Sequence, residues 1–178
     1  LLMHAKQRPT APAMREKEYG IWQTISWQDM ATMVANMACG LHQAGLKRGE
    51  HMVVVGSNRP RLYATMLAAQ SLGAIPIPLY QDAAAPECVF PMNNAEVRLC
   101  VVEDQEQVDK MLEVRETYTA LTHIYYDDPR GLRKYDEPGL GSMDELLASG
   151  QAFAKQHPQF YKEQVEAGTK DEQEAQDG

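Results

Sequence analysis

Four acidic residues lie beside predicted turns and could act as paired carboxylates: Asp82, Glu87, Glu103 and Asp104. Paired carboxylates serve acid–base chemistry when a fold brings them together. Glu103 and Asp104, however, follow an apolar run and precede a helical pattern. We therefore interpret them as acids at a helix N-terminus, where the helix dipole favours negative charge.

The turn from Gly56 to Pro60 is where a nucleotide-binding loop would be expected, because it joins an apolar run to a helical pattern. It matches neither the GxGxxG pattern nor the GxxxxGK[ST] pattern, so neither a dinucleotide site nor a P-loop is supported. We predict instead that Ser57 and Asn58 cap the helix. Arg59 and Arg61 flank the start of this helix. They could bind an anion there, but a solvated face is the simpler interpretation.

The cysteines, histidines and aromatic residues do not indicate a functional site. The three cysteines are odd in number and without CxxC spacing, which indicates reduced thiols, and the five histidines lack metal-ligand spacing. Four aromatic residues could stack on a base, although we favour a place in or around the core: Trp22, Trp27, Tyr125 and Tyr126.

Composition limits the class of protein. The chain has 178 residues and a formal net charge of −8, which argues against binding to nucleic acid and against a polybasic membrane-surface protein. Its apolar runs are shorter than the roughly 18 residues that cross a bilayer. We expect a cytoplasmic protein. Peripheral attachment to the inner face of a membrane is left open.

Alternating strand and helix patterns predict an α/β fold with a mostly parallel sheet flanked by helices. Ser26 and Asp29 resemble a capping box at the start of a helix that ends at Gly45. The run from 74 to 80 contains two prolines and should therefore be an edge strand. Further strands are expected at 21–25, 52–55, 97–102 and 123–126, and further helices from Pro60, Pro86, Gln105 and Ser142.

Three regions follow from this pattern. Residues 1–18 are predicted to be an extended lead-in, residues 19–150 the α/β subdomain, and residues 151–178 a helical and polar tail. The tail has no apolar anchor from about residue 168, where we expect disorder. Pro91 should kink or end its helix early, and residues 129–141 are expected to form a loop.

Five segments, taken in order, resemble the beginning of the AMP-forming acyl-CoA synthetase family, in its long-chain fatty acid–CoA ligase branch. The matching segments are Tyr19–Met30, Gly40–Glu50, Val53–Pro60, Leu72–Asp82 and Asn94–Asp104. The resemblance implies the first subdomain of the large domain of such a ligase. It also implies a reaction in which a fatty acid and ATP form an acyl-adenylate, and CoA then displaces AMP.

In this family the phosphate-binding loop and the catalytic lysine come later than the residues matched here. We therefore assign no catalytic, cofactor-binding or metal-binding residue, and no cofactor, to residues 1–178. ATP, Mg²⁺ and CoA are implied for a parent ligase only. The fragment is expected to be inactive and to associate with itself, because it should leave a sheet edge and apolar helix faces uncovered.

Two other interpretations remain open. The chain could be a non-catalytic α/β interaction or oligomerisation module, or a receiver-like or flavodoxin-like binding domain. A receiver would carry an acidic pair after its first strand, and no acidic pair follows Met52–Val55.

Overall fold

The computed structural model describes the backbone of residues 1–176 and the side chains of residues 1–168. The helices are α1 (Leu2–Gln7), α2 (Trp27–Gln43), α3 (Pro60–Ser71), α4 (Ala85–Asn94), α5 (Gln105–Thr117), α6 (Met143–Gln156) and α7 (Phe160–Gln176). The strands are β1 (Pro12–Glu18), β2 (Ile21–Ser26), β3 (His51–Val55), β4 (Ile75–Leu79), β5 (Leu99–Val102), β6 (His123–Tyr126) and β7 (Leu140–Ser142).

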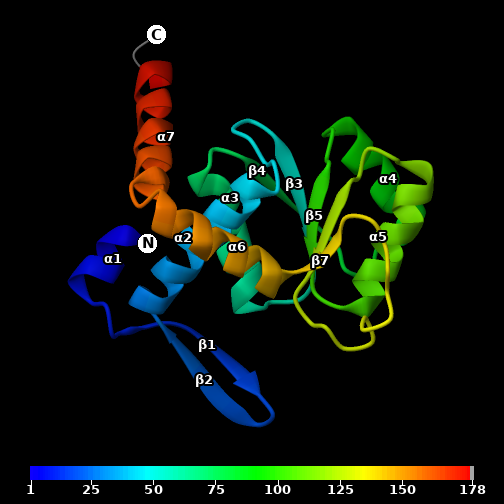
Figure 1. Cartoon of the computed structure of the whole chain (residues 1–178), viewed down its shortest axis with the longest axis horizontal. Coiled ribbons are helices and arrows are strands. Elements are labelled where there is room, and N and C mark those ends of the chain that lie inside the picture. Colours follow the sequence, from blue (N-terminus) through cyan, green and yellow to red (C-terminus); the bar gives the residue numbers. More distant parts are fainter. Residues whose placement is uncertain (177–178) are drawn as a thin grey trace.

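A five-stranded parallel sheet organises the fold, with the order β4-β3-β5-β6-β7 (Figure 1). The predicted α/β class with helices on both faces is confirmed. The loop expected at 129–141 is wrong at its end, because Leu140–Ser142 pairs with β6. Strand β7 could not be predicted from the sequence, because three residues with a glycine in the middle carry no recognisable strand pattern. Their pairing depends on the neighbouring strand β6.

Alternate residues of the central strands supply two separate cores. In β3, Met52 and Val54 pack with helices α2, α3 and α6, whereas Val53 and Val55 pack with α4 and α5. Figure 1 shows α4 and α5 together on one side of the sheet and the other helices on the opposite side. This alternation is what a strand buried on both faces requires.

The edge position predicted for the proline-rich strand is confirmed. Ile75 donates its N–H to the carbonyl of Glu50 beside β3, at 2.9 Å. Successive residues of a strand face opposite edges, so the nitrogens of Pro76 and Pro78 point away from β3. Proline has no N–H. The outer edge of β4 therefore offers no backbone donor at these two positions.

The prediction of an extended lead-in over residues 1–18 is wrong. Residues Leu2–Gln7 form α1, and Pro12–Glu18 forms β1, which pairs with β2 in an antiparallel hairpin separate from the main sheet. The turn at Tyr19 and Gly20 has φ values of 47° and 82°. This is the left-handed geometry of a two-residue hairpin turn, which glycine favours. The strand predicted at 21–25 is confirmed, although it lies outside the main sheet.

Predicted helix ends agree with the structure at several positions. Ser26 and Asp29 form a capping box, and Gly45 follows the helix with a φ of 95°. Ser142 caps α6, as predicted, and the helix ends at Gln156. Helix α4 runs through Pro91 and ends three residues later. The disorder expected from about residue 168 falls mainly on residues whose side chains lie outside the described part, and it stays a prediction.

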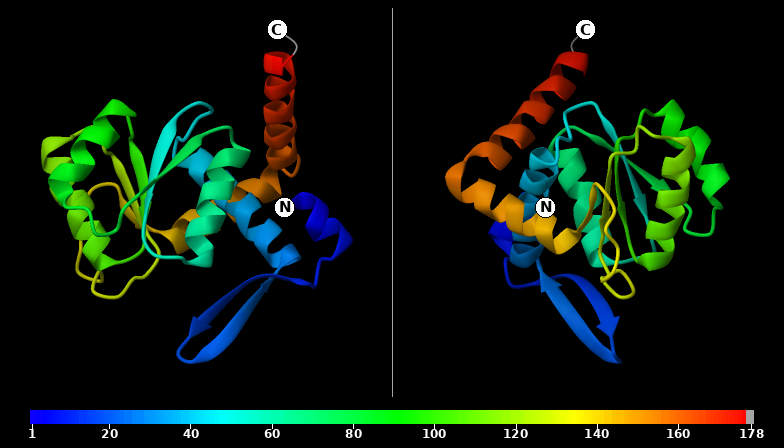
Figure 2. Two further views of the ribbon diagram at one scale, coloured as in Figure 1. Left: turned by 180° about the vertical axis from the view of Figure 1, so that it is seen from behind. Right: turned by 45° about the vertical axis from the view of Figure 1, so that its right-hand side comes forward.

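Two glycines bring α2 and α6 into close contact. A Cβ atom on Gly40 would overlap the carbonyl oxygen of Leu146, and one on Gly150 would overlap that of Asn36. Gly150 is buried. Any side chain at either position would force the helices apart. Beyond α6, helix α7 projects away from the sheet (Figure 2).

Candidate functional site

The strand order identifies one place where this sheet could bind a ligand. In order of appearance the five strands are arranged 2-1-3-4-5, as in other doubly wound sheets. The connections after β3 and β5 therefore leave toward opposite faces. Between the carboxyl ends of these two strands a crevice forms, and open α/β sheets bind ligands in such crevices.

The side chain of Glu103 lies at this crevice and lines a hollow of about 450 Å³ there. Its Oε2 accepts the backbone N–H of Ser57 at 2.5 Å, and its Oε1 accepts the Nε–H of Arg59 at 2.8 Å. A Cβ atom on Gly56 would lie 2.7 Å from the Cβ of Glu103, so glycine is needed for this close approach. A carboxylate of the protein itself thus takes the donors that a bound anion would otherwise use.

The predicted capping by Ser57 and Asn58 is wrong. The N-cap of α3 is Arg59, which forms no side-chain cap. Asn58 instead accepts a hydrogen bond from the hydroxyl of Tyr63 at 2.9 Å. The physical reason is that Pro60 is the first residue of α3, which places both polar residues too early to cap the helix.

Electrostatics favours the charged form of the Glu103 carboxyl. Burial alone would raise its pKa, but the hydrogen bonds from Ser57 and Arg59 outweigh burial and lower the pKa below its ordinary value. Arg59 is also held by Glu16 at 2.9 Å, and both carboxylates raise the pKa of its guanidinium. Since Glu16 lies in β1, this arginine links the hairpin to the sheet.

We expect Glu103→Gln to destabilise the protein at neutral pH and to change its acid unfolding. A carboxylate with a lowered pKa in the folded state stabilises the fold above its unfolded pKa, near 4.5. This contribution disappears as pH falls through the folded pKa. The difference in unfolding free energy between the wild type and the variant should therefore shrink below about pH 4.5.

Urea unfolding monitored by circular dichroism at several pH values measures this difference. Glu106→Gln is the matched control, since Glu106 is an exposed acid in the first turn of α5. It should change stability by no more than about 0.5 kcal/mol. A stability difference for Glu103→Gln that stays constant down to pH 3 would contradict the expectation.

A second ion cluster lies beside the first, at the end of β6. Arg61 contacts Asp127 at 3.1 Å and Asp144 at 2.5 Å. The side chain of Asp127 is only 15% exposed, whereas that of Asp144 is 75% exposed. Burial raises the pKa of Asp127, and the charge of Arg61 opposes this effect. Arg59 and Arg61 therefore form neither an open anion site nor a solvated face, the two interpretations offered by the sequence. Carboxylates of the protein hold both arginines.

Glu103 could be identified from the sequence as a candidate, but its role could not. Glu16, Asp127 and Asp144 were not predicted as site residues. Asp127 and Asp128 directly follow β6, so an acidic pair after a buried strand was an available signal. Glu16 could not be found from sequence, because its partner Arg59 is 43 positions away.

The other predicted acidic residues do not form a pair with one another. Asp104 caps α5 by accepting the N–H of Gln107, and Glu87 accepts the N–H of Ala84 at the start of α4. Asp82 is exposed. Within residues 1–168, no three acidic, histidine or cysteine side chains gather to hold a metal ion. Free and buried thiols are found at Cys39, Cys88 and Cys100.

The four aromatic residues also stay apart. Trp22 is 63% exposed on the hairpin, so the expectation of a place in or around the core is wrong for it. Trp27 packs on the ring of His4, with ring centroids 4.6 Å apart. Tyr125 and Tyr126 in β6 are partly buried and pack against different cores.

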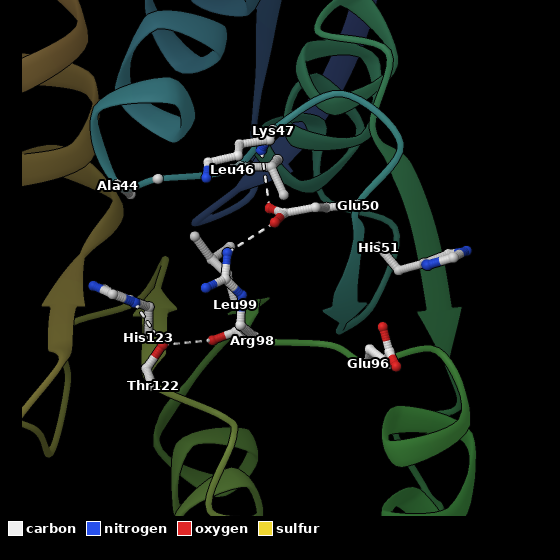
Figure 3. A pocket seen from close by; sticks show the side chains of 11 residues that line it. Ala44, Leu46, Lys47, Glu50, His51, Glu96, Arg98, Leu99, Thr122 and His123 are labelled. Atoms are coloured by element: carbon white, nitrogen blue, oxygen red, sulfur yellow. Dashed lines mark hydrogen bonds and ion pairs between the residues drawn. The ribbon is translucent and has the colours of Figure 1, made fainter.

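A hollow of about 230 Å³ lies at the opposite, amino edge of the sheet (Figure 3). Its polar groups contact one another: Glu50 accepts the N–H of Lys47 at 3.0 Å and pairs with Arg98 at 2.8 Å. The hydroxyl of Thr122 donates to the carbonyl of Arg98. Ligands of open α/β sheets bind at the carboxyl edge, so the crevice at Glu103 is the stronger candidate.

Comparison with known proteins identifies the family. The model of the AMP-binding enzyme family matches residues 1–167. The chain belongs to this family. Long-chain fatty acid–CoA ligases are among its similar proteins, in agreement with the resemblance found in the sequence.

The curated relatives differ greatly in length. The uncharacterized protein Rv1549 from Mycobacterium tuberculosis is 31% identical over 116 residues, which are 65% of this chain and 63% of that protein. The long-chain-fatty-acid–CoA ligase ACSBG1 from Bos taurus is 24% identical over 142 residues. That match covers 78% of this chain but only 19% of ACSBG1.

Solved structures show the same fold. Acetoacetyl-CoA synthetase from Streptomyces lividans gives a TM-score of 0.72 at 20% identity, and the match covers 83% of this chain and 24% of that one. Coronafacic acid ligase from Pectobacterium brasiliense also gives 0.72 at 20% identity, over 83% of this chain and 28% of that one. The sheet and its helices thus have the fold of the matched part of these two ligases. Within the described residues, no helix is long and apolar enough to span a membrane.

Proposed function

We propose that this chain is the first α/β unit of a fatty acid–CoA ligase with a long-chain substrate, and that it has no adenylation activity alone. The observation that carries the proposal is the family match over residues 1–167, joined to a coverage of only 19% of ACSBG1. A protein that includes this unit and the rest of such a ligase would take a fatty acid, ATP and CoA as substrates.

The crevice at Glu103 supports the proposed inactivity. ATP needs backbone donors and cations that are free to hold its phosphates. Here Ser57 and Arg59 donate to Glu103, and Arg61 is held by Asp127 and Asp144. These donors and cations are therefore not available to a nucleotide phosphate, and we derive no reaction step through ATP or Mg²⁺ here.

We expect the purified chain to show no ATP–pyrophosphate exchange with any fatty acid above a no-protein blank. A full-length long-chain ligase assayed in parallel is the positive control. Exchange that depends on the fatty acid and on the amount of this protein would refute the proposal.

A second candidate function is a non-catalytic interaction or oligomerisation module. The observation that favours it is the relative Rv1549. The same 116 residues are 65% of this chain and 63% of Rv1549, so the match extends over most of that relative as well. The genomic sequence after the codon for residue 178 separates the two candidates. A Ser/Thr/Gly-rich loop followed by a lysine favours the ligase, and a stop codon favours the module.

We also propose that the purified chain associates with itself. The unpaired edges and the exposed apolar side chains of the β1–β2 hairpin support this. Light scattering at increasing protein concentration tests it.

A further inference from the structure

The β1–β2 hairpin is the part of the described structure that most needs a further strand. A two-stranded sheet is marginally stable in water, and three strands or more are usually required. The main sheet is protected at both ends, because β4 has outward-facing prolines and β7 has only three residues. The hairpin projects from the body with both of its edges unpaired within the described residues (Figure 1).

The turn determines which peptide groups point outward. Tyr19 and Gly20 occupy the two central positions of the turn, so Glu18 and Ile21 form the hydrogen-bonded pair that closes it. Hydrogen-bonded and non-hydrogen-bonded pairs alternate along an antiparallel ladder. The peptide groups of Trp22 and Thr24 in β2 therefore face outward, ready to pair with another strand.

The two edges of the hairpin are not equivalent. On β1, the residues with outward peptide groups are Arg15 and Lys17, and charged side chains of this kind discourage strand addition. Strand β1 also lies nearer the main α/β unit than β2 does. Its residue Glu16 forms an ion pair with Arg59, at the start of α3. Figures 1 and 2 both show β2 as the outer strand.

The outer strand is uncharged and exposed. Residues Ile21–Ser26 contain no ionisable side chain, in a chain whose net charge is −8. Ile21 is 65% exposed and Trp22 is 63% exposed. Two copies of an acidic protein can thus approach along this strand with no like charges directly opposite each other.

We propose that two copies of the chain associate through β2, which pairs with β2 of the second copy in antiparallel orientation about a two-fold axis at Gln23. This inference rests on the self-association proposed above and assigns its surface. The result is a four-stranded sheet with the order β1-β2-β2-β1. Contacts of this kind are isologous and close after two copies.

The register about Gln23 is self-complementary. Trp22 of one copy lies opposite Thr24 of the other, and these outward peptide groups form hydrogen-bonded pairs. On the opposite face of the sheet, Ile21 lies opposite Ile25. Aromatic–β-branched and apolar cross-strand pairs stabilise a sheet. The pairing thus covers the two exposed apolar residues of β2 without bringing a charge against either.

Thr24→Pro tests the edge directly. It removes the outward N–H of Thr24 but leaves the β1–β2 ladder intact, because that N–H faces away from β1. The dimer loses one donor from each copy, and we expect the dissociation constant to rise about tenfold or more. Arg15→Pro is the matched control, since Arg15 pairs with Thr24 and its N–H faces the opposite edge. It should leave the dissociation constant unchanged.

A cysteine at the two-fold axis tests the register. Gln23→Cys places two thiols in a non-hydrogen-bonded pair, whose Cα separation of about 4.5 Å suits a disulfide. Mild oxidation should give a covalent dimer, and the native cysteines should not interfere because all three are buried. In the control variant Thr24→Cys, each thiol faces Trp22 of the second copy, so cross-linking should be much slower.

Analytical ultracentrifugation and non-reducing gels separate the outcomes. A wild-type dimer that Thr24→Pro dissociates and Arg15→Pro preserves supports the proposal, provided circular dichroism shows both variants folded. A dimer that survives Thr24→Pro overturns this surface but leaves self-association standing. A wild-type monomer at every concentration overturns both proposals and favours a strand of the same chain as the occupant. Faster cross-linking of Thr24→Cys than of Gln23→Cys overturns the register.

Discussion

Gly150→Ala is expected to destabilise the protein by about 2 kcal/mol or more. Alanine favours a helix over glycine by about 1 kcal/mol, so helix propensity alone predicts the opposite sign. The loss arises because the added Cβ overlaps the carbonyl oxygen of Asn36, and backbone atoms cannot rotate away as a side chain can. Helices α2 and α6 must then separate and open the core between them.

Gly168→Ala is the matched control for this prediction. Gly168 also lies in a helix, but a Cβ atom there would meet only Arg48 at 3.6 Å, an ordinary contact distance. This control should be neutral or stabilise the protein by up to about 1 kcal/mol. Urea unfolding of both variants gives the comparison. Equal effects of the two substitutions would show that α2 and α6 are not in close contact.

Arg61→Met should destabilise the protein by about 2–3 kcal/mol at neutral pH, which is the second large effect. The variant leaves the Asp127 carboxylate largely buried and without the cation that opposes its desolvation. Because the pKa of Asp127 is already raised, protonation should restore part of the stability as pH falls. The deficit of the variant should therefore be smaller at pH 5 than at pH 7.

A double-mutant cycle checks the cause. Arg61→Met combined with Asp127→Asn should recover much of the loss, because no buried charge then remains. Asp144→Asn is the control, since Asp144 also contacts Arg61 but is 75% exposed and should contribute less than about 1 kcal/mol. If the double variant is no more stable than Arg61→Met alone, the buried charge is not the cause.

Much of the architecture could be predicted because local chemistry and tertiary structure agree in it. Ser26, Gly45, Ser142 and the proline-rich edge strand each follow from one local rule, and each is found as predicted. The hairpin and β7 were missed for the opposite reason. Residues 12–18 end in four consecutive charged residues, at 15–18, so they show no alternation of apolar and polar side chains, and they pair only because the turn at Tyr19 and Gly20 brings β2 beside them.

The site was less predictable than the fold. Glu103 was visible as an acid after a strand, but its function as an internal anion depends on Ser57 and Arg59, more than 40 positions away. Ser57 and Asn58 are good capping residues by type, yet Pro60 fixes the helix start beyond their reach. Residue type alone cannot reveal such partners, because they meet only when the strands lie in the order that the sheet adopts.

The donor-free edge of β4 has a consequence for the order in which the chain assembles during translation. Once β3 and β4 have left the ribosome and paired, the sheet can grow on one side only. Strands β5, β6 and β7 then emerge in the order in which they are added, each beside the previous one on that side. The nascent protein can therefore extend its sheet in a single direction, with no strand inserted between two that are already paired.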